Sequence, residues 1–292
     1  MSSLAGIRAS TSRPFSRRAA PPWPLLGVAV LVAALALIPL VYLALRAVDG
    51  GVGALEVLFR PRTVELVFST IMLGNAVIVG SIALGVPLAW LTVRTDLPYR
   101  RAWSVLAIAP LAVPSYLLAF AFVGAFAPRG WLGGLGVPSI YGFWGAALVL
   151  SLATMPYVVI ATRAALVRLD PATEEAARSL GRGPWAAART AVLPVLIPAI
   201  GAGALLACLY AISDFGAVSI LRYDTLATAI YSQYRFSFDR SSAASLALLL
   251  LVLALLLVWF EGRIRRRAAL NTPHGRRRVA APVALGRWRV PA

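Results

Sequence analysis

The chain has 292 residues, of which 60% are hydrophobic, and its formal net charge is +17. Soluble proteins average about 45–50% apolar residues, so this composition indicates a membrane protein. The single cysteine, Cys208, excludes an intrachain disulfide and a cysteine metal site. All basic residues are arginine, which excludes a serine–lysine catalytic dyad.

Six apolar runs are long enough to cross a bilayer. A polar tail, residues 1–22, precedes them, and a basic tail or linker, residues 268–292, follows them. The first run is too long for a signal peptide and no small-residue cleavage site follows it. We therefore expect an all-α polytopic membrane domain over residues 23–267, with six transmembrane helices at 23–45, 64–93, 102–127, 140–162, 195–213 and 242–260.

Two of these runs contain residues that interrupt their apolar character. Pro110 and Pro114 lie in the third run, where we expect neighbouring groups to satisfy the freed carbonyls. Asn75 is the clearest polar side chain in a span, and we expect it to bond to another helix rather than to gate a pore. Between spans five and six, residues 214–241 are expected to form a loop rich in aromatic residues.

The arginines indicate the orientation of the chain. Most of the 28 lie in the two tails, at 94–101 and at 163–189, which six spans place on one side. Because cytoplasmic segments of membrane proteins carry the excess of arginine, these segments and both termini are expected to be cytoplasmic. The charge thus sets topology, and no nucleic-acid partner is expected.

A polar segment, residues 163–194, separates the fourth and fifth spans. Asp170 is a good helix N-cap before Pro171, and Glu174 and Glu175 follow in the first turn, where the helix dipole favours negative charge. The glycine bend at Gly181 then ends this helix, and a second short helix follows. An amphipathic helix resting on lipid headgroups is the alternative interpretation of this pattern.

The same segment resembles the EAA loop of binding-protein-dependent ABC importer permeases. Glu175-Ala176-Ala177, Gly181 and Leu193-Pro194 match its spacing, although Ala191 stands where isoleucine is usual. The resemblance implies a type I ABC importer permease fold in a bacterial inner membrane, a cytoplasmic ABC ATPase and a periplasmic solute-binding protein. It assigns coupling to the ATPase to Glu174, Glu175, Ala176, Ala177, Gly181, Leu193 and Pro194.

A second stretch is similar to iron(III) importer permeases. It comprises residues 213–218, 221–226, 229–231 and 239–240, and begins Ser213-Asp214-Phe215-Gly216. Thiamine, polyamine and sulfate permeases share less of it. Iron permeases often fuse two six-span halves, so this chain is expected to need a second permease half, either a copy of itself or a separate chain. It is otherwise a split product or a fragment.

The sequence lacks the motifs of common enzymes. It has no Walker loop, no His-Glu-x-x-His pair and no Gly-x-Ser-x-Gly elbow, so ATP hydrolysis belongs to a separate subunit. No cofactor is expected, and no metal site, because hard oxygen ligands for iron do not cluster in the spans. The spans hold almost no charge, which argues against an ion-coupled secondary transporter or channel. A membrane scaffold without transport activity is the other alternative.

Overall fold

The computed structural model describes residues 23–128, 130–132, 139–169, 179, 181, 183, 186, 188–237 and 239–269, and these contain helices and no β-strand. The chain divides into two units, residues 1–43 and 44–292. Helix α1, Trp23–Asp49, supplies the described part of the first unit, and its exposed side chains are almost all apolar. The expected tail at 1–22 lies outside the described residues, as does the expected tail at 268–292 apart from its first two residues, which continue helix α12, Arg240–Ala269.

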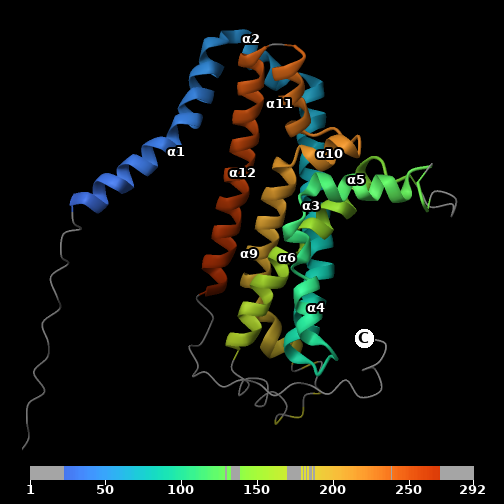
Figure 1. Cartoon of the computed structure of the whole chain (residues 1–292). Helices are drawn as coiled ribbons and strands as arrows, with labels where there is room; N and C mark the ends of the chain where they lie inside the picture. Colours follow the sequence, from blue (N-terminus) through green and yellow to red (C-terminus); the bar gives the residue numbers. More distant parts are fainter. Residues whose placement is uncertain are drawn as a thin grey trace, which may run out of the picture. The chain divides into compact units, whose positions relative to one another are not determined.

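The second unit is a bundle of long helices connected by short ones (Figure 1). Its long helices are α3, Pro61–Arg94, α6, Phe143–Arg168, α9, Leu193–Ser213, and α12, Arg240–Ala269. The shorter helices are α2, Gly51–Glu56, η1, Val57–Phe59, α4, Arg100–Leu106, η2, Ala109–Ala112, α5, Ser115–Phe126, η4, Ala188–Val192, α10, Gly216–Ile220, and α11, Leu226–Arg235. Among the described residues, five helices are long and apolar enough to span a membrane, or six with the bent pair of residues 100–126.

That bent pair replaces the continuous third span expected from the sequence. The helical segments Arg100–Ala112 and Ser115–Phe126 meet at an angle of 101°. Val113 and Pro114 adopt extended backbone conformations, with ψ angles of 118° and 141°. The chain breaks here because Pro114 has no N–H to continue the first helix and its ring disfavours a helical conformation at Val113.

Helices α3, α6 and α9 pack against one another and form the core of the second unit. The Ser81 and Thr154 hydroxyls are 2.9 Å apart between α3 and α6, which satisfies two buried polar groups. Gly203 brings α9 close to α6, since a Cβ there would lie 2.7 Å from the Cα of Val158. Small residues thus let the helices approach closely, as membrane helices commonly do.

Two expectations from the sequence, on Asn75 and on the segment 214–241, are corrected. Asn75 donates a hydrogen bond from Nδ2 to the carbonyl oxygen of Ile71, at 2.9 Å, in its own helix rather than to a neighbour. Asn75 is exposed, so its amide bonds to the carbonyl one turn earlier in α3. The segment 214–241 is also not a simple loop, because it contains α10 and α11.

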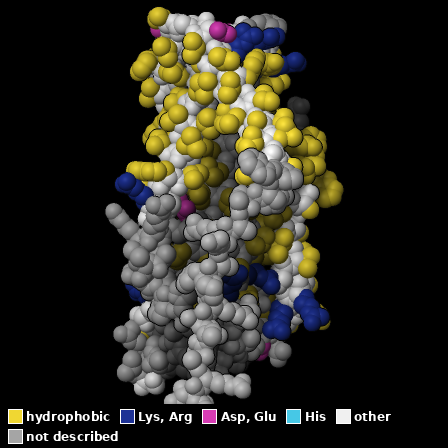
Figure 2. All heavy atoms as spheres, turned by 90° about the vertical axis from the view of Figure 1, so that its left-hand side faces the viewer, with side chains coloured by type: hydrophobic (Ala, Val, Ile, Leu, Met, Phe, Trp, Pro, Cys, Tyr) yellow, Lys and Arg dark blue, Asp and Glu magenta, His cyan; other side chains and the backbone are white. Residues whose placement is uncertain are grey.

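The second unit has two distinct ends. The loop end is where α3 and α6 finish and α9 begins, and the cap end holds η1, the start of α3 and α11 (Figure 1). Hydrophobic side chains cover much of the face drawn in Figure 2, with arginine side chains between and beyond them. Leu255, Leu256 and Phe260 of α12 are exposed apolar side chains, as lipid contact requires.

Candidate functional site

The segment predicted to couple to an ATPase connects the loop-end termini of α6 and α9. Glu174, Glu175, Ala176 and Ala177 lie outside the described residues. Gly181 is exposed and has a φ of +80°, the left-handed conformation that a glycine bend provides. Leu193 and Pro194 are the first two residues of α9, where proline is well tolerated.

The two ends of this segment are held together by an apolar cluster. Leu166 and Leu169 lie near the start of the segment, Val192 lies near its end and Leu196 follows it, and all four are buried with Ala89 of α3. Burying large aliphatic side chains stabilises such a cluster by about 1.5–3 kcal/mol each. The segment therefore leaves and re-enters the bundle at one place, where its two ends pack together against α3.

Polar contacts add to the attachment of α3 at the same end. Thr92 donates to the carbonyl of Leu88 at 2.7 Å and accepts a hydrogen bond at 3.4 Å from Nη1 of Arg163 on α6. The guanidinium of Arg94, the last residue of α3, lies 5.6 Å from the centre of the Trp90 ring. The Thr92 hydroxyl thus bonds both to a carbonyl of its own helix and to an arginine of α6, and so connects the two helices.

An apolar groove of about 590 Å³ opens beside this cluster. Its lining residues come from α3 and from the region where α9 begins, and they are Val86, Pro87, Trp90, Leu91, Arg189, Leu193 and Leu196. Leu193 is the only predicted coupling residue among the described members of this lining, and 41% of its surface is exposed. The start of α9 is therefore accessible from outside the bundle.

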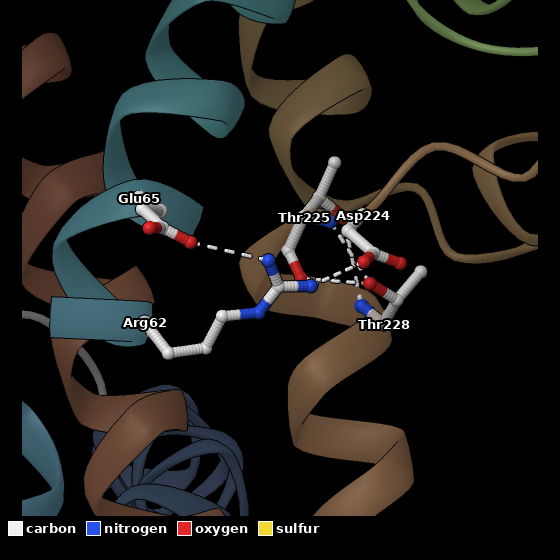
Figure 3. Close-up of polar contacts among 5 residues, drawn as sticks. All are labelled: Arg62, Glu65, Asp224, Thr225 and Thr228. Atoms are coloured by element: carbon white, nitrogen blue, oxygen red, sulfur yellow. Dashed lines mark hydrogen bonds and ion pairs between the residues drawn. The ribbon is translucent and has the colours of Figure 1, made fainter. Parts of the chain in front are cut away.

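At the cap end, the stretch that resembles iron permeases is used for internal contacts. Arg62 on α3 forms an ion pair with Asp224 and donates to Glu65 at 3.2 Å (Figure 3). The neighbouring Thr225 and Thr228 form a reciprocal capping box at the start of α11. The capping box stabilises the start of α11. The ion pair connects the residue before it to α3, although this pair is exposed and contributes little stability by itself.

Two further residues of this stretch support neighbouring elements. The Arg222 guanidinium lies 4.8 Å from the Tyr141 ring centre, next to the start of α6. Asp239 caps α12 by accepting two hydrogen bonds from Ser242, one from the backbone N–H at 3.0 Å and one from the side-chain hydroxyl at 2.5 Å. These hydrogen bonds lower the pKa of the Asp239 carboxyl below its usual value.

The partners of the motif residues were not identified from the sequence. Arg62 and Ser115 each contact a residue that is distant in the chain. A local pattern carries no signal for such contacts, whereas the Thr225–Thr228 spacing is a recognisable cap. Within the described residues, no three His, Cys, Asp or Glu side chains group together as a metal site would require.

Comparison with known proteins places the chain in a family. Residues 66–270 match the family described as "binding-protein-dependent transport system inner membrane component". The Fe(3+)-transport system permease protein FbpB 2 of Haemophilus influenzae is 34% identical over 251 residues, which are 86% of this chain and 47% of that protein. This chain therefore spans about half the length of that relative.

Two other comparisons also match proteins of transport systems. The sulfate transport system permease protein CysT of Escherichia coli is 28% identical over 221 residues, which cover 73% of this chain and 80% of that protein. A bacterial alginate ABC transporter, solved with an alginate pentasaccharide-bound periplasmic protein, has a chain with a TM-score of 0.66 at 18% identity, covering 84% of this chain and 94% of that one. This chain belongs to the family of binding-protein-dependent transport system inner membrane components.

Proposed function

We propose that this chain is the membrane-spanning permease subunit of an ATP-driven importer that receives its solute from a binding protein. The observation that carries the proposal is the family match, which spans residues 66–270 and includes the EAA-like segment. The chain has no motif for nucleotide hydrolysis, so the energy comes from a separate cytoplasmic ABC ATPase. Its other soluble partner is a periplasmic solute-binding protein.

The coupling site of this importer is the segment 163–194. Glu174, Glu175, Ala176 and Ala177 would contact the ATPase, and Gly181 provides the bend between them and Leu193 and Pro194. The buried cluster of Leu166, Leu169, Val192 and Leu196 supports this role, because it joins both ends of the segment to the helix bundle. A partner that displaces the segment would move α6 and α9 together.

The loop end faces the cytoplasm in this proposal, and both termini lie there too. The support is the arginine distribution, since most of the 28 arginines fall in the segments that this orientation places inside. The membrane is the inner membrane of a bacterium. One coupling segment serves one ATPase and an ABC importer uses two, so the complete transporter contains a second permease half, either a copy or a separate chain.

The proposed cargo is iron(III). The support is the 34% identity to a protein named as an Fe(3+)-transport permease, which is higher than the 28% to a sulfate permease. Sulfate is the second candidate because that relative also matches most of this chain, and thiamine and polyamines belong to the same class of importer. Iron ligands belong to the binding protein, since the described part of the permease has no group of three suitable side chains.

Transport by a reconstituted assembly tests the proposal. The chain would be placed in proteoliposomes with a candidate ATPase and a candidate binding protein from the same organism. We expect uptake of radiolabelled iron(III) that requires ATP, the ATPase and the binding protein. Uptake of sulfate in place of iron would select the second cargo, and uptake driven by an ion gradient without the ATPase would refute the importer class.

A further inference from the structure

Two breaks in the helical chain meet at one buried polar contact. Helix α5 begins at Ser115, directly after the 101° bend, and α9 ends where Asp214 adopts an extended conformation with a ψ of 127°. The Ser115 hydroxyl donates a hydrogen bond to Oδ2 of Asp214, across 99 positions of sequence. Ser115 is 4% exposed and Asp214 is 9% exposed, so little water reaches this contact.

The second carboxylate oxygen of Asp214 serves a different helix. Oδ1 accepts the backbone N–H of Ala217 at 2.8 Å, which caps the start of α10. A buried carboxylate is costly unless its oxygens are hydrogen-bonded, and both oxygens of Asp214 are. One side chain therefore ties together the end of α9, the start of α10 and the start of α5.

The packing around this contact is equally close. A Cβ on Gly216 would lie 2.9 Å from Cβ of Tyr116, the second residue of α5, so only glycine lets the two elements approach this far. Ala119 of α5 and Ala217 of α10 are fully buried in the same apolar cluster. Figure 1 shows α10 lying beside α5, as their contacts require.

Helix α9 links this contact to the proposed coupling site. It starts with Leu193 and Pro194 at the loop end and runs without a break to Ser213. Its 21 residues, with Pro198 among them, correspond to a length of roughly 30 Å. A shift at the coupling segment is thus delivered to Asp214, and from there to α5 if the contact with Ser115 holds.

We propose that Asp214 is a positioning residue of the transport cycle, which clamps α5 to the corner of α9 and α10. This inference rests on the proposed importer function. The two short helices then turn as one element about the breaks at Pro114 and Asp214, in the manner of hinge motions, which concentrate at the ends of elements. Discontinuous helices border the solute path in many transporters, so the clamp converts movement of α9 into opening or closing of that path.

The clamp also changes the interpretation of the motif that begins Ser213-Asp214-Phe215-Gly216. Its carboxylate and its glycine are committed to α5 and α10, so they act in coupling and do not select the cargo. Variants of the clamp should therefore alter how much solute is moved for each ATP while leaving the preference for one cargo over another unchanged.

The test compares two single hydroxyl deletions. Ser115→Ala removes the clamp, whereas Ser213→Ala removes a neighbouring hydroxyl that donates to the carbonyls of Leu209 and Tyr210 in its own helix, at 2.8 and 3.1 Å. The measurement is solute transported per ATP hydrolysed by the assembled importer. Loss of a hydrogen bond to a charged group shifts a two-state equilibrium by about tenfold, so we expect a fall of that order in Ser115→Ala and none in Ser213→Ala. Ser115→Thr, which keeps the donor, should recover most of the ratio.

A parent-like ratio in Ser115→Ala would overturn the clamp. That holds whether transport and ATPase activity both stay unchanged or both fall in proportion, as a purely structural defect predicts. Amide hydrogen exchange of the chain alone in nanodiscs gives a measurement that does not depend on importer activity. There, amides of α5 should exchange faster in Ser115→Ala than in Ser213→Ala, and equal rates would also refute the clamp. An inactive parent assembly with faster α5 exchange would count against the proposed function while supporting the clamp.

Discussion

Replacement of Gly181 by valine tests the coupling assignment most directly. Gly181 has a φ of +80°, and a Cβ built on it meets no heavy atom within 4 Å. The substitution is therefore opposed by backbone conformation alone and not by a clash. A residue with a Cβ costs about 1–2 kcal/mol in the left-handed region, and β-branching increases that cost. The population of the native bend should fall by a factor of roughly 5–30.

Gly183 provides a matched control two residues away. It is exposed, its Cβ would also meet nothing within 4 Å, and its φ lies outside the range that favours glycine. Gly183→Val adds the same side chain to the same segment without the conformational cost. The assay is binding-protein-stimulated ATP hydrolysis by the reconstituted importer, with membrane insertion checked in parallel.

We expect Gly181→Val to remove most of the stimulation while Gly183→Val keeps it, with both chains inserted normally. Equal loss in the two variants would show that bulk, and not the left-handed bend, is what matters. Parent-like stimulation in Gly181→Val would mean that the segment is a passive connector, and the coupling assignment would be wrong.

Three further predictions concern the coupling helix, the topology and the core. Glu175→Arg should leave insertion intact but weaken association with the ATPase, measured by co-purification; undiminished association would exclude a contact at this residue. Cysteine introduced at Ser3 should be labelled only from the cytoplasm and at Gly134 only from outside, and the reverse pattern would invert the proposed orientation. Gly203→Ala should lower the melting temperature because its Cβ would lie 2.7 Å from the Cα of Val158, whereas Gly201→Ala, with nothing within 4 Å, should not; equal melting would contradict the close α6–α9 approach.

Hydropathy predicted most of the long helices because it is a local property. The runs at 64–93, 140–162 and 195–213 correspond to α3, α6 and α9, whose bounds differ by a few residues. Helix ends depend on capping and on packing of the last turn, so α6 continues to Arg168, where Leu166 is buried. The left-handed bend at Gly181 was also predictable, because only glycine adopts that conformation without cost.

The third span was not predictable in the same way. Pro110 and Pro114 lie in an apolar run that is long enough to cross a membrane, and a proline there can bend a helix or end it. Whether the helix bends or ends depends on which partners the unpaired backbone groups and the next helix contact in the folded protein. Here α5 turns by 101° and packs on α10, where Ser115 finds the carboxylate of Asp214.

The all-α membrane class and the family could be predicted from the sequence, because apolar length and short motifs are local features of the chain. Three contacts could be identified only in the folded chain: Asp214 bonds to a serine 99 positions earlier, Asn75 bonds within its own helix, and Arg62 pairs with Asp224. Each of these depends on which helix faces arrive side by side. The packing of α3, α6 and α9 against one another sets that arrangement. The contacts of a single residue therefore depend on how all the helices of the bundle pack.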